Sequence, residues 1–567
     1  MRSVDDGRIA HRGLVLCLLT TLALGLAACG GGGGGGGGTG GDGGDAGGGG
    51  GGGDTGGGGG GGAAPDVTIS GKVQFERVPH TGTGPLDYNA VFDVPVRQAV
   101  VQAVSSTGSV LETARTDDAG DYSLVVPGET QLFIRVRAEI VDSGGRWDFK
   151  VVDNTSNGAL YVLDGAVASS GDADSVRDLT AQTGWNGFSY ASARAAGPFA
   201  ILDSVNEARL AVLAVDPDVS FEALTLNWSP DNRPVSGSRA NGEIGTTFYT
   251  ANEIFVLGAE NNDTDEYDGH VVVHEFGHFF EDTLSRADSV GGPHTTADIL
   301  DPRVAFSEGF GYAWAGIVLG DAVTQDSFGN DQSLGFIIDV DANVNANPGW
   351  YSEGSAQSIL FDLFDADDDG VDNIALGFQP LYDVLVNTQR TSDAFTTVFS
   401  YVDALKTARP ADAAAIDAVV AAQDIVSATI EPFASTETND AGNADVLPVY
   451  TEITVGGPAR TVCSIDTFGD FNKLSNRRFL WFDVAASGRY EVTVTGPNGS
   501  DPDIVLWQRG FVAISQLETN GQETLTTPVL APGRYLLEVY EGSFVFTNLA
   551  GGVPSGRACL DVSVATS

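Results

Sequence analysis

Hydrophobic and polar residues alternate with two different periods along the chain, and the changes of period divide it into three folded parts. Period-two alternation broken by turn residues predicts short strands from Asp66 to about residue 165 and again beyond Pro432. Helical spacing dominates between them, at 198–214, 267–285, 303–319 and 354–364, with three further helical segments within 379–423. The sequence therefore predicts a multidomain protein, in which an α+β domain with a helical second half is flanked by two all-β sandwiches.

The residues before the first strand do not have the pattern of a globular fold. Three arginines precede an apolar stretch at 14–28, which is short for a membrane span and ends in Leu-Ala-Ala before Cys29, as a secretory signal peptide does. Residues 30–62 hold 27 glycines in 33 positions, and such a coil spans about 30 to 35 Å. We expect residues 1–28 to be a leader and 29–65 to be a tether.

The end of this leader resembles the lipoprotein box of bacteria, in which the cysteine after the cut carries lipid. The resemblance implies acylation of Cys29 in the cell envelope. Gly30 stands where the family has an Asp that retains lipoproteins in the inner membrane, so the outer membrane or the cell surface is the expected location. An uncleaved anchor or a chance cysteine is the alternative.

Charge and composition restrict the possible partners. The 567 residues contain 76 acidic and 29 basic side chains, a net charge of −47, which argues against nucleic acid or an anionic membrane surface as partner. A hydrophobic content of 42% is too high for a wholly disordered chain. We expect a protein or peptide partner, with membrane contact only through the lipid; the oligomeric state stays open.

Two cysteines remain outside the leader and the lipid site. Cys463 and Cys559 lie near the two ends of the C-terminal segment, and export places them in an oxidising compartment. A disulfide between them is the expectation, and two free buried thiols are the alternative.

The two β-rich flanks resemble known accessory domains. Residues 116–127 are similar to the last hairpin of carboxypeptidase-regulatory or transthyretin-like domains. The Asp-Pro-Asp turn at 501–503 and the Ala-Pro-Gly-x-Tyr run at 531–535 resemble the pre-peptidase C-terminal domain of secreted peptidases. With the changes of period they give three parts, namely a sandwich at 66–170, the α+β domain at 171–430 and a sandwich at 431–567. Residues 66–180 could also serve as a propeptide.

The candidate chemistry is concentrated in one run of the central domain. His274 and His278 are four residues apart, so a helix places both imidazoles on one face, with Glu275 beside them. Two imidazoles at this spacing suit zinc, and the adjacent carboxylate suits a base acting on a bound water. The alternative is a homologue that keeps the fold and has lost the metal.

A catalytic zinc needs a third protein ligand and one open position. Asp301 and Pro302 begin a second predicted helix as cap and first residue, which places Glu308 nearly two turns in. Two packed helices then offer two histidines and one glutamate to the same point.

This arrangement resembles the gluzincin metallopeptidases, and Ser-Glu-Gly-Phe-Gly at 307–311 is similar to the Glu-Gly-Trp segment of fungalysin- and thermolysin-like enzymes. The resemblance implies that His274, His278 and Glu308 bind zinc and that Glu275 is the base of an endopeptidase. Tyr312 departs from the family pattern, in which an Asp orients a ligand histidine. We expect a carboxylate from elsewhere to orient it instead, and the candidates are Asp263, Asp265, Asp268 and Asp301.

Other residues are candidates for supporting roles. His270 precedes His274 by one turn, and we expect a polar supporting role, because three successive turns do not converge on one ion. His294 is an alternative third ligand, a transition-state donor or an ordinary loop residue. No histidine follows it, so Tyr351 is the preferred donor to the oxyanion, with core or rim packing as its alternative. The β-like run at 246–257 offers an edge for an extended peptide.

A second cation site is possible after the fourth predicted helix. Asp365, Asp367 and Asp369, followed by Gly370, open like a calcium loop, but Leu376 stands where such a loop has its bidentate Glu. A solvated acidic turn is the alternative reading.

The sequence thus predicts an exported, membrane-anchored zinc endopeptidase. The rival is a non-catalytic surface binding or adhesion lipoprotein with a degenerate zincin domain. Glu275 favours the enzyme, because a metal scaffold needs no base there; Tyr312 and the missing downstream histidine favour the rival.

Overall fold

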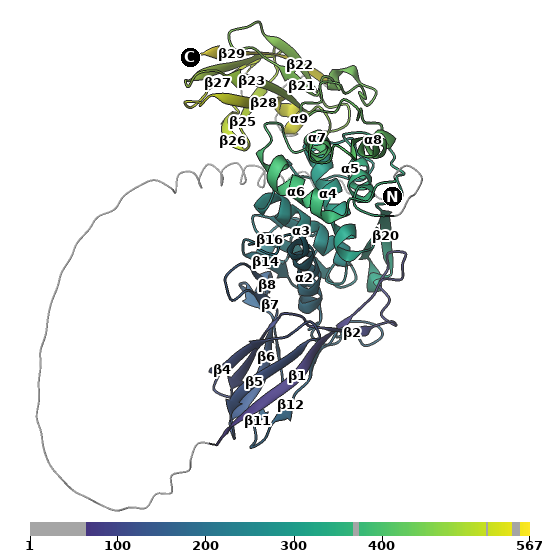
Figure 1. Cartoon of the computed structure of the whole chain (residues 1–567), viewed down its shortest axis with the longest axis vertical. Helices are drawn as coiled ribbons and strands as arrows, with labels where there is room; N and C mark the ends of the chain where they lie inside the picture. The colour runs from purple at the N-terminus through teal and green to yellow at the C-terminus, as the bar shows by residue number, and fades with distance from the viewer. Residues whose placement is uncertain (1–63, 367–372, 518–519, 547–555) are drawn as a thin grey trace, which may run out of the picture.

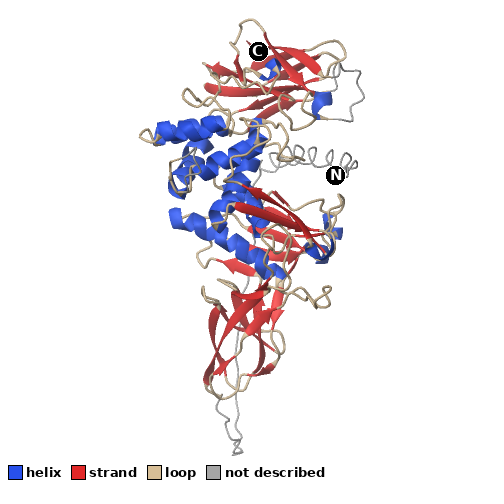
Figure 2. Cartoon of the chain, turned by 90° about the vertical axis from the view of Figure 1, so that its right-hand side faces the viewer, coloured by secondary structure: helices blue, strands red, loops and turns tan. Residues whose placement is uncertain are grey.

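The computed structural model describes residues 64–366, 373–517, 520–546 and 556–567. Its parts follow one another along the long axis, with strands at both ends and most helices in the middle (Figure 1, Figure 2). The predicted leader, Cys29 and the glycine tether lie outside the described residues, as do Asp367 and Asp369. Within the described part of the chain, no helix is both long and apolar enough to cross a bilayer.

The N-terminal part contains two sheets built on the predicted alternation. In β5 (Asp121–Pro127), every second side chain is buried. One sheet has the order β12-β1-β13, with β2 and β5 also on β1, and the other has the order β10-β6-β3-β4, with β11 on β6. The remaining strands of the two sheets are β1 (Asp66–Arg77), β2 (Phe92–Pro95), β3 (Val100–Ser105), β4 (Val110–Arg115), β6 (Gln131–Arg137), β10 (Val162–Asp164), β11 (Ala168–Ser169), β12 (Ser175–Val176) and β13 (Leu179–Ala181).

The central sheet takes strands from both sides of residue 170. Its order is β15-β16-β14-β8-β7, with β9 on β8. Its strands are β7 (Glu139–Val141), β8 (Asp148–Asp153), β9 (Ala159–Leu160), β14 (Leu224–Trp228), β15 (Phe248–Thr250) and β16 (Glu253–Val256).

The boundary expected at residue 170 therefore does not follow the sheets. Strand β8 alternates like its neighbours in sequence, so periodicity alone does not show which sheet it joins. It pairs in parallel with β14 and lies inside the central sheet. Cleavage after residue 180 would remove it, which argues against 66–180 as a removable propeptide.

The helical half of the central domain is confirmed. Its four longest predicted segments correspond to α2 (Gly197–Val215), α3 (Gly269–Thr283), α4 (Pro302–Leu319) and α5 (Glu353–Asp362). They are followed by α6 (Phe378–Asp383), the π-helical turn η4 (Val384–Gln389), α7 (Val398–Ala408) and α8 (Ala413–Ala422). Short 3₁₀ turns lie at Asn154–Ser156, Arg239–Asn241, Asn330–Gln332 and Ala444–Val446.

The sequence analysis missed a small sheet beside the helices. Its order is β17-β18-β19-β20. The edge strand β20 has no clean alternation of buried and exposed positions. Three of its apolar residues, Leu334, Phe336 and Ile337, are exposed. The strands are β17 (Gly258–Ala259), β18 (Asp263–Thr264), β19 (Val323–Phe328) and β20 (Leu334–Asp339).

The C-terminal part is the predicted β-sandwich, with sheets β21-β23-β28-β25-β26 and β22-β29-β24-β27. Cys463 and Cys559 face each other across β22 and β29 and form the predicted disulfide, with Cα atoms 3.9 Å apart. The elements are β21 (Tyr450–Glu452), β22 (Arg460–Ile465), β23 (Arg477–Val484), β24 (Tyr490–Thr495), β25 (Pro502–Trp507), β26 (Phe511–Ser515), β27 (Gln522–Thr526), β28 (Gly533–Glu541), α9 (Gly542–Val545) and β29 (Arg557–Thr566).

The sandwich packs against the start of α4. Arg303 is fully buried there and pairs with Asp301 at 2.9 Å and with Glu538 of β28 at 2.8 Å. Its guanidinium also lies 4.7 Å from the ring centroids of Phe395 and Phe479. Removing one partner of such a buried pair typically costs about 3 to 5 kcal/mol, because it leaves a buried charge unpaired, so Arg303 needs its partners from both domains.

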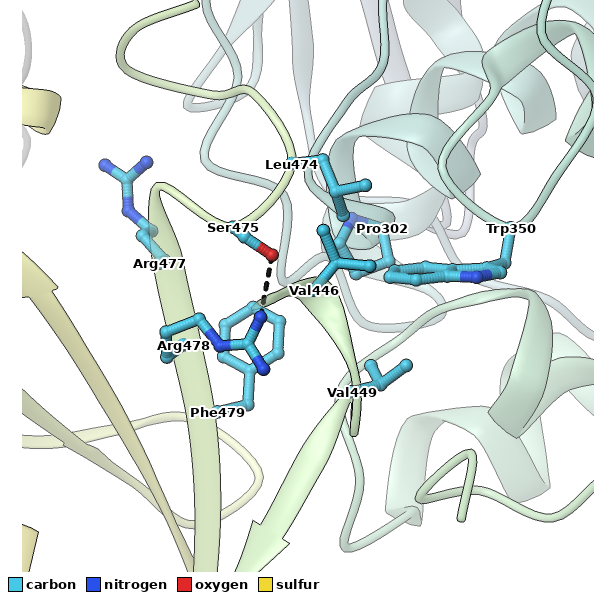
Figure 3. Close-up of a pocket in the computed structure, with 9 residues that line it drawn as sticks. All are labelled: Pro302, Trp350, Val446, Val449, Leu474, Ser475, Arg477, Arg478 and Phe479. Carbon is cyan, nitrogen blue, oxygen red and sulfur yellow. Dashed lines mark hydrogen bonds between the residues drawn. The ribbon is translucent and has the colours of Figure 1, made fainter. Parts of the chain in front are cut away.

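Packing beside this pair leaves little empty space. Figure 3 shows Pro302 of α4 with Leu474 beside it and Trp350 on one side, and Phe479 of β23 on the other. The cavity that these residues line has a volume of only about 10 Å³, enough for at most one water. The start of α4 is therefore fixed between two domains.

Candidate active site

Helix α3 supplies the two histidines. Its apolar face is buried through residues such as Val272, Phe276 and Phe279, which fixes the rotation of the helix. His274 and His278 then lie on the same side, with ring centroids 4.9 Å apart and Nε2 atoms 3.2 Å apart.

Helix α4 supplies the glutamate. Asp301 caps it by accepting a hydrogen bond from the backbone N–H of Arg303, and Pro302 is its first residue, as predicted. Glu308 Oε2 lies 3.3 Å from His274 Nε2 and 3.5 Å from His278 Nε2. The three predicted ligand side chains thus come together, with ligand atoms all within 4.8 Å of one another.

This donor set fits zinc. Ligands about 2.0 to 2.1 Å from a tetrahedral zinc lie about 3.4 Å from each other, and the three separations here are 3.2, 3.3 and 3.5 Å. Two imidazole nitrogens and one carboxylate oxygen also match the ligand types of a catalytic zinc, with the fourth position left for water.

Glycines on both helices, Gly277 of α3 and Gly311 of α4, allow the two helices to approach each other closely. A Cβ on Gly311 would lie 2.6 Å from Cε1 of His274, and one on Gly277 would lie 3.1 Å from the ring of Trp314. Any side chain at residue 311 therefore displaces the imidazole of His274, so this glycine is part of the site although it carries no chemistry.

Glu275 is oriented by the central sheet. Its Oε2 accepts a hydrogen bond of 2.8 Å from the backbone N–H of Tyr249, in the edge strand β15. Desolvation raises the pKa of Glu275, against the opposing effect of His274 and His278. A carboxylate held in this way beside the two histidines is in place to accept a proton.

The carboxylate beside His278 is one that the sequence analysis missed. Glu281 Oε2 lies 3.4 Å from His278 Nδ1 and accepts a hydrogen bond of 2.5 Å from Ser307 of α4. The expected candidates lie elsewhere: Asp301 pairs with Arg303, and Asp268 accepts hydrogen bonds from Ser327. The sequence could have predicted this pair, because Glu281 follows His278 by three residues on the same helix.

Tyr312 is the residue that departs from the gluzincin pattern, and it packs on a candidate ligand. Its ring meets the edge of His274 at a centroid distance of 4.6 Å and an interplanar angle of 71°. In the part of the chain that the structure describes, Nδ1 of His274 has no hydrogen-bond partner. His274 is therefore oriented by packing, and His278 by a carboxylate.

His294 comes to the site from the loop between α3 and α4. Its Nε2 lies 3.1 Å from Glu308 Oε2, and its Nδ1 lies 2.6 Å from Oε2 of the buried Glu353, at the start of α5. Burial opposes protonation, but Glu308 and Glu353 outweigh it and raise the pKa of His294 to about 10. The imidazole borders the candidate metal position without belonging to the set of three.

Tyr351, the preferred oxyanion donor, points elsewhere. Its hydroxyl donates hydrogen bonds to Asn439 Oδ1 at 3.0 Å and to the carbonyl of Pro348 at 3.3 Å. The side chain is 5% exposed and packs against Trp350. The structure gives it the packing alternative and brings His294 to Glu308.

Two further histidines lie at the start of α3, one in its first turn and one contacting the residue before it. His270 Nε2 lies 3.1 Å from the carbonyl of Asp321, which matches the expected supporting role. His80, from the N-terminal part, lies 3.3 Å from Asp268, the residue before the helix. Burial lowers the pKa of both imidazoles.

Acidic residues form a second cluster near α3. Asp263, Asp265 and Asp326 place carboxylate oxygens within 4.8 Å of one another. Burial and the neighbouring carboxylate charges raise the pKa of Asp263 to about 7 and that of Asp326 to about 8. The calcium hypothesis for Asp365 extends into residues outside the described part and stays a prediction.

Comparison with protein families gives a match over the central part of the chain. Residues 214–423 match the mycolysin C-terminal domain; this segment contains all the candidate ligands and Glu275. No curated protein matches. This part of the chain is therefore similar to a domain of a peptidase family, and the match supports a metallopeptidase-associated protein.

Several solved structures match about a fifth of the chain. The pre-peptidase C-terminal domain of a collagenase from Bacillus anthracis is 18% identical and covers 20% of this chain and 93% of its own, with a TM-score of 0.14. CorA, a surface-associated copper-binding protein of Methylomicrobium album, is 10% identical over 21% of this chain and 98% of its own, with a TM-score of 0.17. A periplasmic lysozyme inhibitor from Aeromonas hydrophila is 17% identical over 20% and 96%, with a TM-score of 0.13.

Proposed function

We propose that the protein is an exported zinc-dependent endopeptidase of gluzincin type. The observation that supports this best is the meeting of His274, His278 and Glu308 at ligand spacing, with Glu275 beside them. Zinc held by the three side chains would supply an acidified water and polarise the scissile carbonyl.

The protein's own residues then move the proton and stabilise charge. Glu275 accepts the proton of the attacking water and returns it to the leaving amine. His294, held through its Nδ1 by Glu353, directs its Nε2 towards the site, where it donates to the oxyanion in place of Tyr351. Glu281 keeps the imidazole of His278 aligned.

The substrate is an extended peptide lying along the central sheet. Strand β15 pairs only with β16 and is the edge of that sheet among the described strands. Its Tyr249 amide contacts Glu275 directly. A peptide added to this edge brings its carbonyl groups beside the base.

The first test uses the unmodified protein. We expect about one zinc per chain and cleavage of an unfolded protein that is abolished by a chelator and restored by zinc. Metal analysis and a gel-based digestion measure both. Bound zinc without cleavage of any unfolded substrate contradicts the peptidase and supports the non-catalytic binding lipoprotein. That alternative is favoured by Nδ1 of His274, which has no partner among the described residues.

We also propose that lipid on Cys29 anchors the protein to the cell envelope. The support is the sequence of the leader and the tether that follows it. Cys29→Ser is expected to move the protein from the membrane fraction to the soluble fraction, because the substitution removes the site of the acyl chains. Fractionation combined with metabolic labelling by a radioactive fatty acid measures this. The proposal is contradicted if the unmodified protein takes up no label and the variant stays in the membrane fraction to the same extent.

A further inference from the structure

The loop that carries His294 is held by the C-terminal sandwich. Asn472 donates through its side-chain amide to the carbonyls of Gly291 at 2.9 Å and Pro293 at 3.3 Å. Lys473 Nζ lies 3.0 Å from the same Pro293 carbonyl and 3.4 Å from Asp298. The peptide group immediately before His294 thus accepts hydrogen bonds from two side chains of another domain.

Backbone pairing extends the contact towards the third ligand. Leu474 donates its amide to the carbonyl of Ile299 at 3.0 Å, and Asp301 donates its amide to the carbonyl of Asn472 at 2.9 Å. The same turn of the sandwich therefore holds the loop on both sides of His294 and the residue that caps α4, the helix of Glu308.

The turn of the sandwich that makes these contacts, residues 471–476, is itself rigid. Asn476 is fully buried, and its Oδ1 accepts the amide of Lys473 while its Nδ2 donates to the carbonyls of Ile465 and Gly469. Asn472 is 1% exposed. Phe471 is fixed by a hydrogen bond from its amide to the carbonyl of Phe544. Buried amides with all these bonds made rarely change conformation.

We infer that Asn472 and Lys473 are positioning residues of the active site, and that the C-terminal sandwich completes it. The inference rests on the proposed function, because it assigns these residues a role through His294. They orient the backbone at Pro293, while Glu353 orients the imidazole. Without them the imidazole of His294 keeps its hydrogen bond to Glu353, but the carbonyl of Pro293 loses the hydrogen bonds that fix the backbone before His294.

The expected effect is on turnover. A displacement of about 1 Å in a group that acts on the transition state can cost about 100-fold in rate. The side chain of Asn472 bonds the carbonyls of Gly291 and Pro293 and the ammonium of Lys473, and none of these is a candidate ligand. We therefore expect Asn472→Asp to lower kcat about 10-fold to 100-fold, with KM and zinc content unchanged.

The variants isolate the hydrogen bonds. Asn472→Asp keeps the shape and the contact to Lys473 but replaces the donor to both carbonyls with an oxygen. Lys473→Met removes the second donor, and Lys473→Arg keeps one and should restore most of kcat. Lys406→Met is the matched control, because Lys406 is a similarly buried lysine of α7 that bonds Asp417 and the carbonyl of Ser427.

A spectroscopic readout separates this inference from the proposed function. In metal-free protein labelled with ¹⁵N-histidine, the Nδ1 resonance of His294, assigned by its loss in His294→Asn, reports its bond to Glu353. We expect it to shift in Asn472→Asp and Lys473→Met and to stay in Lys406→Met. If the unmodified protein cleaves nothing, the proposed function fails, while this resonance still decides whether the sandwich positions His294.

Two results would overturn the inference. One is an unchanged kcat and an unchanged His294 resonance in both Asn472→Asp and Lys473→Met. The other is a loss of kcat matched by equal losses of zinc and of thermal stability, with no recovery in Lys473→Arg, which is the behaviour of a purely structural contact.

Discussion

Glu275→Gln is expected to lower kcat by about 10³-fold or more while leaving KM, zinc content and thermal stability close to those of the unmodified protein. General-base catalysis contributes about 10²-fold to 10⁴-fold. A glutamine keeps the shape of the side chain and, through Oε1, still accepts the 2.8 Å hydrogen bond from the Tyr249 amide. It cannot accept a proton from water, so the loss falls on the chemical step alone.

The measurement is steady-state cleavage of a fluorogenic peptide, with metal analysis on the same samples. Asp282→Asn is the matched control, since Asp282 lies on the same helix and accepts a hydrogen bond of 2.7 Å from the hydroxyl of the same Tyr249. Unchanged turnover in Glu275→Gln would show that another group takes the proton and would remove Glu275 from the mechanism.

The meeting of the three candidate ligands, His274, His278 and Glu308, could be predicted because each helix fixes its own residues locally. Residues four apart on a helix share a face, and this places His274 and His278 together whatever the rest of the fold does. Asp301 and Pro302 set the start of α4 and so the position of Glu308 along it. Only the close approach of the two helices needed the structure, and Gly311 explains it.

The supporting groups could be predicted less well, because they depend on distant parts of the chain. His294 and Glu353 are 59 residues apart and meet through a loop, for which no periodicity exists. Tyr351 stands two residues before Glu353, but its hydroxyl points to Asn439. Sequence reasoning preferred Tyr351 as the donor and kept His294 as an alternative, since it had no means to know which of the two side chains comes close to Glu308.

The domain boundaries show the same limit at a larger scale. Alternation identified strands in both flanks, and the disulfide of the C-terminal sandwich could be predicted from counting cysteines. The same alternation could not assign β8 to the central sheet, because a strand pattern records one buried face and not the partner strand. Nor could it show that Asn472 of the outer sandwich contacts the loop of His294.

The second large effect is expected for Glu308→Gln, which should lower zinc affinity at least 100-fold and abolish cleavage. The substitution preserves volume in a buried position but removes the one negative charge of the ligand set. Two imidazoles alone do not complete a protein zinc site, which needs three ligands. Competition with a fluorescent chelator measures the affinity, and the rise in melting temperature on adding zinc should disappear.

Two comparison variants give this result its meaning. Glu207→Gln, on α2, removes a carboxylate that pairs with Arg97 far along the chain from the ligands and should bind zinc normally. His294→Gln tests the competing assignment, because His294 Nε2 lies only 3.1 Å from Glu308 Oε2. If His294 is a donor to the oxyanion, His294→Gln keeps zinc and loses turnover. If instead it loses zinc while Glu308→Gln keeps it, the third ligand is the imidazole, and Glu308 serves to orient three histidines around the metal.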